Sequence, residues 1–171
     1  MHRFTRFATV LALMFTLVAG TLAAPVIPEK VNKEAKGEGI FGDARVLTAI
    51  TGSDLNEILK DAGYADGKVD EDGDVLIKIE DRLVYFLVAP NMESVQAKAA
   101  WRTSDSSRPS ADKVNGWNRM KKYSKAYFDE DRDPVLELDL DLAGGVTVAR
   151  IKDFALTVKA SVRAFTSEVL Q

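Results

Sequence analysis

Carboxylates are the side chains of this chain that could most readily do chemistry. Glu137, Asp139 and Asp141 alternate with leucines along one predicted strand, which places successive carboxylates about 7 Å apart on one face. Paired carboxylates can act as general acid and general base, as in glycosidases, but one of them then needs a raised pKa in a dry pocket. Three acidic residues on the polar side of an alternating strand are more simply a solvent-exposed face, so we expect no catalytic residue there.

Two acidic runs, which begin at Asp70 and Asp129, resemble calcium loops at first sight. An EF-hand loop needs glycine at its sixth position and glutamate at its twelfth. Those positions hold Val75 and Asp81 in the first run, and Pro134 and Leu140 in the second. We therefore interpret both runs as solvated turns and expect no metal and no cofactor. A weaker, irregular calcium site stays open as the alternative.

The first 24 residues predict export. Arg3 and Arg6 precede an apolar run from Ala8 to Ala19, and small residues follow it, which is the layout of a secretory signal peptide. The run is shorter than the roughly 20 residues of a membrane span; a retained N-terminal anchor is the alternative. We expect cleavage after Ala23 rather than Ala24, and a periplasmic or secreted protein with no membrane span after signal removal.

The composition of the mature chain excludes several classes of chemistry. The chain has no cysteine, and its one histidine, His2, lies in the predicted signal peptide. Without thiol or imidazole the mature chain has no disulfide, no serine or cysteine protease machinery and no His or Cys metal site. Signal removal takes two of 23 basic residues and none of 26 acidic ones, which leaves 21 against 26 and a net charge near −5. Such a protein has no broad attraction to nucleic acid.

The elements that position these residues follow from periodicity and turn signals. A leader over 24–42 precedes one domain over 43–171. The predicted elements are a short strand over 45–50, a helix capped by Ser53 and stopped by Gly63, strands over 68–72, 75–79 and 83–89, a short helix over 92–101, a helix over 112–123, strands over 125–129 and 135–142, and a helix from Gly145 toward Leu170. The residues 80–82 form a tight hairpin, and the continuously apolar strand over 83–89 is expected to be buried on both faces.

Two helices carry further candidate sites. Trp117, between Asn115 and Asn118, could line a small-molecule or peptide pocket, but its helical spacing with Val114 and Met120 favours a core position. The last helix carries a long apolar stripe that one small sheet would not cover completely. Part of that stripe is therefore a predicted surface for self-association or partner capture, formed by Phe154, Val158, Val162 and Phe165.

The region from Val114 to Val146 combines a helix, a turn, a strongly alternating strand and a glycine break. Its segments read VNGWN from Val114, YFDED from Tyr127, DPVLELDLDL from Asp133 and GGV from Gly144. As a whole it resembles the signature of the YbjN family of bacterial sensory transduction regulators, which is similar in fold to the type III secretion chaperones. The candidate binding and family-motif residues are Asn115, Trp117, Asn118, Asp129, Asp131, Glu137 and Asp139.

The resemblance implies a small sheet-and-helix module, often dimeric, that works by binding. The expected fold is α+β, a mainly antiparallel sheet with helices packed on it, in the order helix, three strands, helix, two strands, helix. One departure is the turn Asp131-Arg132-Asp133-Pro134, where the family usually has acidic residues with glycine; the signal peptide is another.

Together these observations predict an exported, non-catalytic binding or regulatory module. It would engage a protein or peptide partner in the bacterial envelope, in a stress response or a chaperone-like role, and a homodimer is compatible with this interpretation. The alternatives are a small carboxylate-dependent hydrolase and a structural oligomeric envelope protein.

Overall fold

The computed structural model of this chain describes residues 42–171. The predicted signal peptide over 1–23, its cleavage at Ala23 or Ala24, and all but the last residue of the predicted leader lie outside the described residues and stay predictions. Within the described part, no helix is both long enough and apolar enough to cross a membrane.

A six-stranded sheet forms the centre of the fold, and each pair of neighbouring strands in it is antiparallel. Its strands, in spatial order, are β2 (Lys68–Val69), β3 (Val75–Ile79), β4 (Arg82–Val88), β5 (Ser94–Ala100), β7 (Pro134–Asp141) and β6 (Lys125–Phe128). Two short strands, β1 (Val46–Leu47) and β8 (Val146–Thr147), pair with each other as a second sheet. The predicted α+β class with an antiparallel sheet is therefore confirmed.

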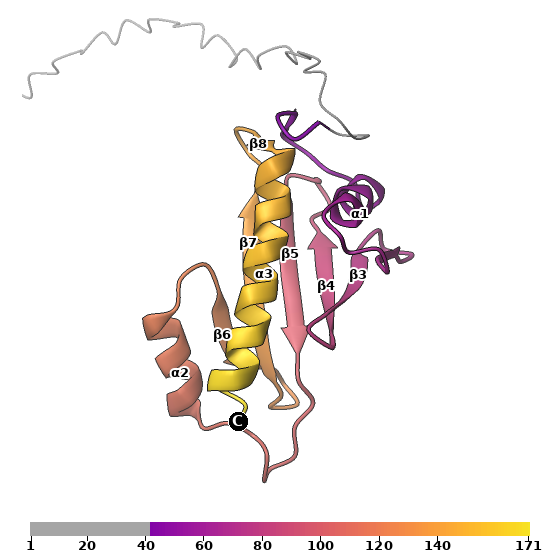
Figure 1. The fold of residues 1–171 in the computed structure, drawn as a ribbon. Helices are drawn as coiled ribbons and strands as arrows, with labels where there is room; N and C mark the ends of the chain where they lie inside the picture. Colours follow the sequence, from indigo (N-terminus) through magenta and orange to yellow (C-terminus); the bar gives the residue numbers. More distant parts are fainter. Residues whose placement is uncertain (1–41) are drawn as a thin grey trace, which may run out of the picture. The chain divides into compact units, whose positions relative to one another are not determined.

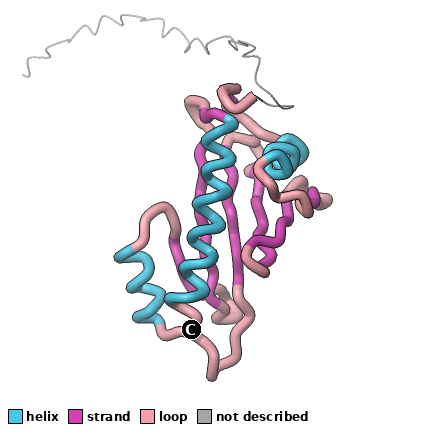
Figure 2. Tube along the Cα trace, in the orientation of Figure 1, coloured by secondary structure: helices cyan, strands magenta, loops and turns pink. Residues whose placement is uncertain are grey.

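The three helices pack on one face of the six-stranded sheet. They are α1 (Gly52–Asp61), α2 (Ala111–Met120) and α3 (Val148–Glu168). Figures 1 and 2 show α3 running along the sheet, with α1 on one side of it and α2 beside the edge strand β6 on the other. Ring contacts place them on a shared core, since Phe154 of α3 meets Phe86 of β4, and Phe165 of α3 meets Trp117 of α2.

The predicted helix over 92–101 is wrong, because this segment forms the strand β5. Its alanines have high helix propensity, which misleads a reading of local sequence. The burial pattern nevertheless has a period of two, with Val95, Ala97 and Ala99 buried and polar side chains between them. Pairing with β4 on one side and β7 on the other overrides the propensity of an alanine-rich segment. Four strands of the large sheet, rather than three, therefore precede α2.

The predicted association surface on the last helix is also wrong. Phe154, Val158, Val162 and Phe165 are each at most 3% exposed, because their side of α3 lies against the sheet. Phe165 packs between two indoles, 5.0 Å from Trp101 and 5.1 Å from Trp117 between ring centroids. The additional strand β5 and Trp101 directly after it widen the surface that α3 covers, so the whole stripe is used inside the monomer.

Strand β4 was expected to be buried on both faces, and it is buried on one. Val84 and Phe86 are completely buried, whereas Leu83 is 49% and Tyr85 is 38% exposed. A continuous apolar run therefore marks a central strand here without marking a second covering layer. The hairpin before β4 is confirmed, with Glu80 and Asp81 at φ +48° and +62°, as a two-residue turn between antiparallel strands requires.

Smaller differences concern the ends of elements. Thr51, rather than the predicted Ser53, is the N-cap of α1, and its hydroxyl accepts a hydrogen bond from the backbone N–H of Asp54. Gly63 follows the helix at φ +95°, which confirms the predicted stop. The predicted strands over 45–50 and 68–72 shrink to the two-residue strands β1 and β2.

Candidate functional site

The face of the large sheet that the helices leave uncovered is the candidate site. We call it the open face. Alternation and strand register place on it the outward side chains of β3 to β7, because the inward ones form the core. Its members include Leu76, Lys78, Leu83, Tyr85, Leu87, Gln96, Lys98, Lys125, Tyr127, Glu137 and Asp139.

Four large side chains form an apolar strip along the open face. The strip consists of Leu76 on β3 and of Leu83, Tyr85 and Leu87 on β4. Tyr85 lies opposite Leu76 in the strand register, so the two strands contribute to one patch. Leu83 and Tyr85 are exposed, and Leu76 and Leu87 are half-buried. A contiguous exposed apolar patch on a folded chain is typical of an interaction surface.

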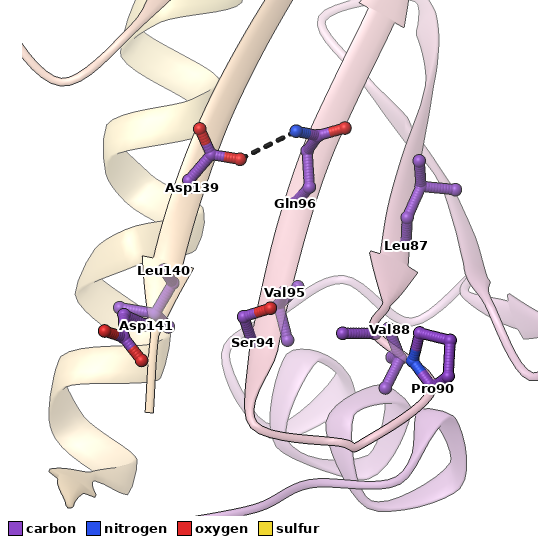
Figure 3. A pocket seen from close by; sticks show the side chains of 10 residues that line it. Leu87, Val88, Pro90, Ser94, Val95, Gln96, Asp139, Leu140 and Asp141 are labelled. Atoms are coloured by element: carbon purple, nitrogen blue, oxygen red, sulfur yellow. Dashed lines mark hydrogen bonds between the residues drawn. The ribbon is translucent and has the colours of Figure 1, made fainter. Parts of the chain in front are cut away.

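Two hollows lie at the two ends of this strip. One, of about 540 Å³, is lined by Leu76, Leu83 and Val69 together with Lys68, Lys78, Asp66 and Asp70. The other, of about 490 Å³, is lined by Leu87, Pro90, Gln96, Asp139 and Asp141 among others, and Figure 3 shows these side chains. Tyr85 lies on β4 between Leu83 and Leu87, so the strip joins the two hollows. Each hollow combines an apolar floor with polar side chains that could orient a bound chain.

Glu137 corrects the prediction of a solvent-exposed row of carboxylates, because it is only 5% exposed. The phenol of Tyr127 donates a hydrogen bond to its Oε1. Lys125 Nζ lies 2.9 Å from Oε2, and Lys98 Nζ lies 3.5 Å from Oε1. The register explains this cover, since Lys98 on β5 and Lys125 on β6 are the residues opposite Glu137 on β7. Asp139 remains exposed, as predicted, and accepts a 2.7 Å hydrogen bond from Gln96 Nε2 (Figure 3).

The electrostatics of this cluster are unfavourable for acid catalysis. Burial by itself raises the pKa of the Glu137 carboxyl. The hydrogen bonds from Tyr127 and Lys125 and the charges of Lys125 and Lys98 lower this pKa by more than burial raises it, so that it falls below its usual value. Burial, together with the hydrogen bond to Glu137, raises the pKa of the Tyr127 phenol to about 12. A general acid needs a carboxyl with a raised pKa near the operating pH. Glu137 instead stays ionised and binds its neighbours.

Trp117 is a core residue, as its helical spacing predicted. It is 2% exposed, and its Nε1 donates to the hydroxyl of Ser124 at 3.1 Å. Met120 was expected on the same buried face, but it is 69% exposed because α2 ends there and the chain turns away. The helical pattern is therefore reliable up to the last turn of α2 and fails at its final residue.

Asn118 protects the edge strand β6. Its Oδ1 accepts from the backbone N–H of Ala126 and its Nδ2 donates to the C=O of the same residue, both at 2.8 Å. The side-chain amide thus satisfies a backbone donor and acceptor that an edge strand would otherwise present to another chain. Asn118 thus binds backbone groups of the neighbouring strand, whereas Asn115, the other amide beside Trp117, is exposed.

In both acidic turns, an aspartate carboxylate accepts hydrogen bonds from backbone N–H groups of the same turn. Asp70 Oδ1 accepts from the N–H groups of Asp72 and Asp74, and Asp129 Oδ1 accepts from the N–H of Asp133. Arg132 takes φ +64° in the second turn, so an arginine adopts the left-handed conformation that favours glycine. Within residues 42–171, no group of three or more acidic, histidine or cysteine side chains is arranged to hold a metal ion.

The predicted site residues therefore separate into three places. Glu137 and Asp139 lie on the open face, Trp117 and Asn118 lie beneath and beside the edge of the sheet, and Asp129 and Asp131 belong to the turn between β6 and β7. The apolar strip was not predicted as a site. The sequence feature that could have indicated it is the continuously apolar run from Leu83 to Val88. Alternate side chains of a strand point to opposite faces, so such a run places apolar side chains on both faces of the sheet.

Comparisons with known proteins give one family match. The family model YbjN, described as "Putative bacterial sensory transduction regulator", matches residues 51–171. No curated protein matches the chain. Among solved structures, the chain is similar to the Yersinia pestis type III secretion chaperone SycH, solved in complex with a stable fragment of YscM2. That similarity has a TM-score of 0.44 and 15% identity, and it covers 65% of this chain and 98% of the other.

Proposed function

We propose that this chain, which belongs to the YbjN family as its sequence predicted, is a non-catalytic module that binds a protein or peptide partner on the open face. The observation that carries the proposal is the apolar strip, which is exposed between two hollows while the opposite face of the same sheet is fully packed. Regulation by binding is consistent with the description of the family.

The chemistry of the open face supports binding rather than catalysis. Its buried carboxylate, Glu137, has a lowered pKa and three partners, so it is neither a general acid nor an unoccupied base. Outside His2 the chain contains no imidazole, and it contains no thiol. Within residues 42–171, Glu137 is therefore not the carboxyl of raised pKa that the alternative, a carboxylate-dependent hydrolase, would need.

The composition of the open face indicates the kind of partner. An apolar centre with a polar, charged surround is the usual anatomy of a protein–protein interface. Here Leu83 and Tyr85 form the centre, while Lys68, Lys78 and Asp139 stand in the surround. A partner segment with apolar side chains, long enough to reach both hollows, fits this arrangement.

The compartment is part of the same proposal. The basic, apolar and small-residue regions of the first 24 residues support export, so we place the protein in the periplasm or outside the cell. We place its partner in the bacterial envelope as well, in a stress response or a chaperone-like role.

Site-specific photocrosslinking in the native cell tests the binding surface. A photoreactive phenylalanine analogue replaces Tyr85 on the open face, and a matched variant carries it at Leu156, which is 58% exposed on α3. We expect Tyr85 to yield a discrete crosslinked protein and Leu156 to yield none. Crosslinks of equal yield at both positions, or none at Tyr85, would contradict the proposal. A crosslink to a second copy of this chain would favour the structural oligomer instead.

A further inference from the structure

The junction between α2 and β6 carries the densest positive charge of this acidic chain. Residues 119–125 read RMKKYSK, with four cations and no acidic residue, although the whole chain has more acidic than basic residues. We call these seven residues the basic corner. Figure 1 shows the connector running in an arc from the end of α2 to the start of β6, at the edge of the sheet far from α1.

The basic corner also presents two large apolar side chains to solvent. Met120 is 69% and Tyr123 is 78% exposed, more than any other large hydrophobic residue of the described part. Tyr123 is held at φ +67°, a left-handed conformation that is uncommon for a bulky residue. Non-glycine residues in this region concentrate at binding and switch sites, where the surrounding structure holds them.

Contacts on both sides hold the connector in place. Trp117 Nε1 binds the hydroxyl of Ser124, and the Asn118 amide binds both backbone groups of Ala126. Met120 and Tyr123 lie in the sequence between these contacts, so the backbone that carries both exposed side chains is held on each side.

Two of the four cations are available to a ligand. Lys121 pairs with Glu168 at 2.7 Å, and Lys125 pairs with Glu137 at 2.9 Å. The side chains of Arg119 and Lys122 make no hydrogen bond or ion pair with any residue between 42 and 171. Arg119 directly precedes Met120 and Lys122 directly precedes Tyr123, so charge and apolar surface are combined at one corner.

We propose that the basic corner docks on the surface of a bilayer that contains anionic lipid. The corner combines cations with the exposed side chains of Met120 and Tyr123, which is the combination that a planar surface of anionic headgroups over an apolar interior can meet. Tyrosine is favoured at the headgroup level of membranes, and Lys and Arg near the surface are attracted to anionic headgroups. The corner shares only Lys125 with the open face, and this lysine is paired with Glu137, so docking does not depend on partner binding there.

A local fluorescence measurement tests this docking, because the chain has no cysteine. Met120→Cys carries an environment-sensitive dye at the corner, and Leu156→Cys carries the same dye at an exposed position of α3. The protein purified from expressing cells is mixed with phosphatidylglycerol vesicles or with neutral phosphatidylcholine vesicles. Since the predicted signal peptide could bind lipid by itself, the difference between the two dye positions is the readout.

We expect a blue shift at position 120 with phosphatidylglycerol only, and none at position 156. Arg119→Gln combined with Lys122→Gln in the labelled Met120→Cys chain should weaken partitioning about 30-fold, from about 1 kcal/mol per cation near an anionic surface. High salt should have the same direction of effect. Equal shifts at both positions, equal shifts with neutral vesicles, or a shift with a polyglutamate peptide but not with vesicles would overturn the proposal.

Discussion

Glu137 lies at the centre of the charged part of the open face, between a tyrosine and two lysines. A buried charge is tolerated when its partners replace the lost hydration, and removing one member of such a group is costly. At the scale of single residues, the open face is therefore held by a network whose members come from β5, β6 and β7.

The first prediction concerns this network and pH. Folding lowers the pKa of the Glu137 carboxyl from its usual 4.5. Its ionised form therefore stabilises the fold above pH 4.5, and this contribution is lost as the pH falls through the lowered value. We expect Glu137→Gln to cost about 1–3 kcal/mol at neutral pH. Melting temperatures measured from pH 3 to 7 should fall less steeply on the acid side in this variant than in the wild type.

The matched control for that series is Asp139→Asn. Asp139 lies two residues away on the same strand face, but its side chain is 59% exposed. We expect this variant to stay within about 0.5 kcal/mol of the wild type. Identical pH profiles for the wild type and Glu137→Gln would show that ionisation of Glu137 contributes nothing to the loss of stability at acid pH.

A second residue-scale prediction concerns Asn118 and the edge of the sheet. Asn118→Ala leaves the N–H and C=O of Ala126 without their partners, which we expect to cost about 1–3 kcal/mol and to increase aggregation through β6. Chemical denaturation and light scattering measure the two effects. Asn115→Ala, an exposed asparagine on the same helix, is the control and should change neither.

At the scale of elements, the C-terminal helix and the strand β5 depend on each other. The helix α3 places a continuous apolar stripe on the sheet, and β5 supplies the central strand that makes the sheet wide enough to receive it. Phe165 is the point where the helix meets Trp101 and Trp117 together. The helix therefore acts as the cover of the core.

The prediction for this element is that Phe165→Ala destabilises the fold by about 3–5 kcal/mol without any specific effect on association, because it leaves a cavity between two indoles. Leu156→Ala on the exposed side of the same helix should cost under about 1 kcal/mol. Thermal melts and sedimentation of both variants check this. If the Phe165→Ala chain melted like the wild type but changed its oligomeric state, the prediction of an association surface on α3 would be supported instead.

At the scale of the whole molecule, one face of the sheet stabilises the fold and the other is available for binding. The acidic turns take part in the first role, because Asp70 and Asp129 accept backbone N–H bonds within their own loops. The Oδ1 atoms of Asp70 and Asp129 are already hydrogen-bond acceptors, and within residues 42–171 no group of three or more acidic side chains is arranged to hold an ion.

We therefore expect millimolar calcium, compared with a chelator, to leave the melting temperature unchanged. A specific site occupied at 100 times its dissociation constant would add about 2.7 kcal/mol, which a thermal melt resolves readily. Magnesium at the same concentration serves as the control for ionic strength. A rise with calcium alone would show that the loops rearrange to form an ion site.

The sequence by itself determined those features that depend on local pattern. The alternation of leucine and acid along β7, the stripe of α3, the stop at Gly63 and the core position of Trp117 are each encoded within one element and its turns. The antiparallel α+β class followed from the order of these elements, whereas the family followed from the resemblance of residues 114–146 to its signature.

Only the tertiary structure decided what depends on neighbours distant in sequence. The alanine-rich β5 is a strand because β4 and β7 flank it, although its local propensity favours a helix. Glu137 is buried because Lys98 and Lys125 stand opposite it in the register. Leu83 and Tyr85 are exposed because all the helices pack on the opposite face of β4. Alternation shows which side chains share a face, but the three-dimensional arrangement determines which face is covered, and the candidate site is the face left uncovered.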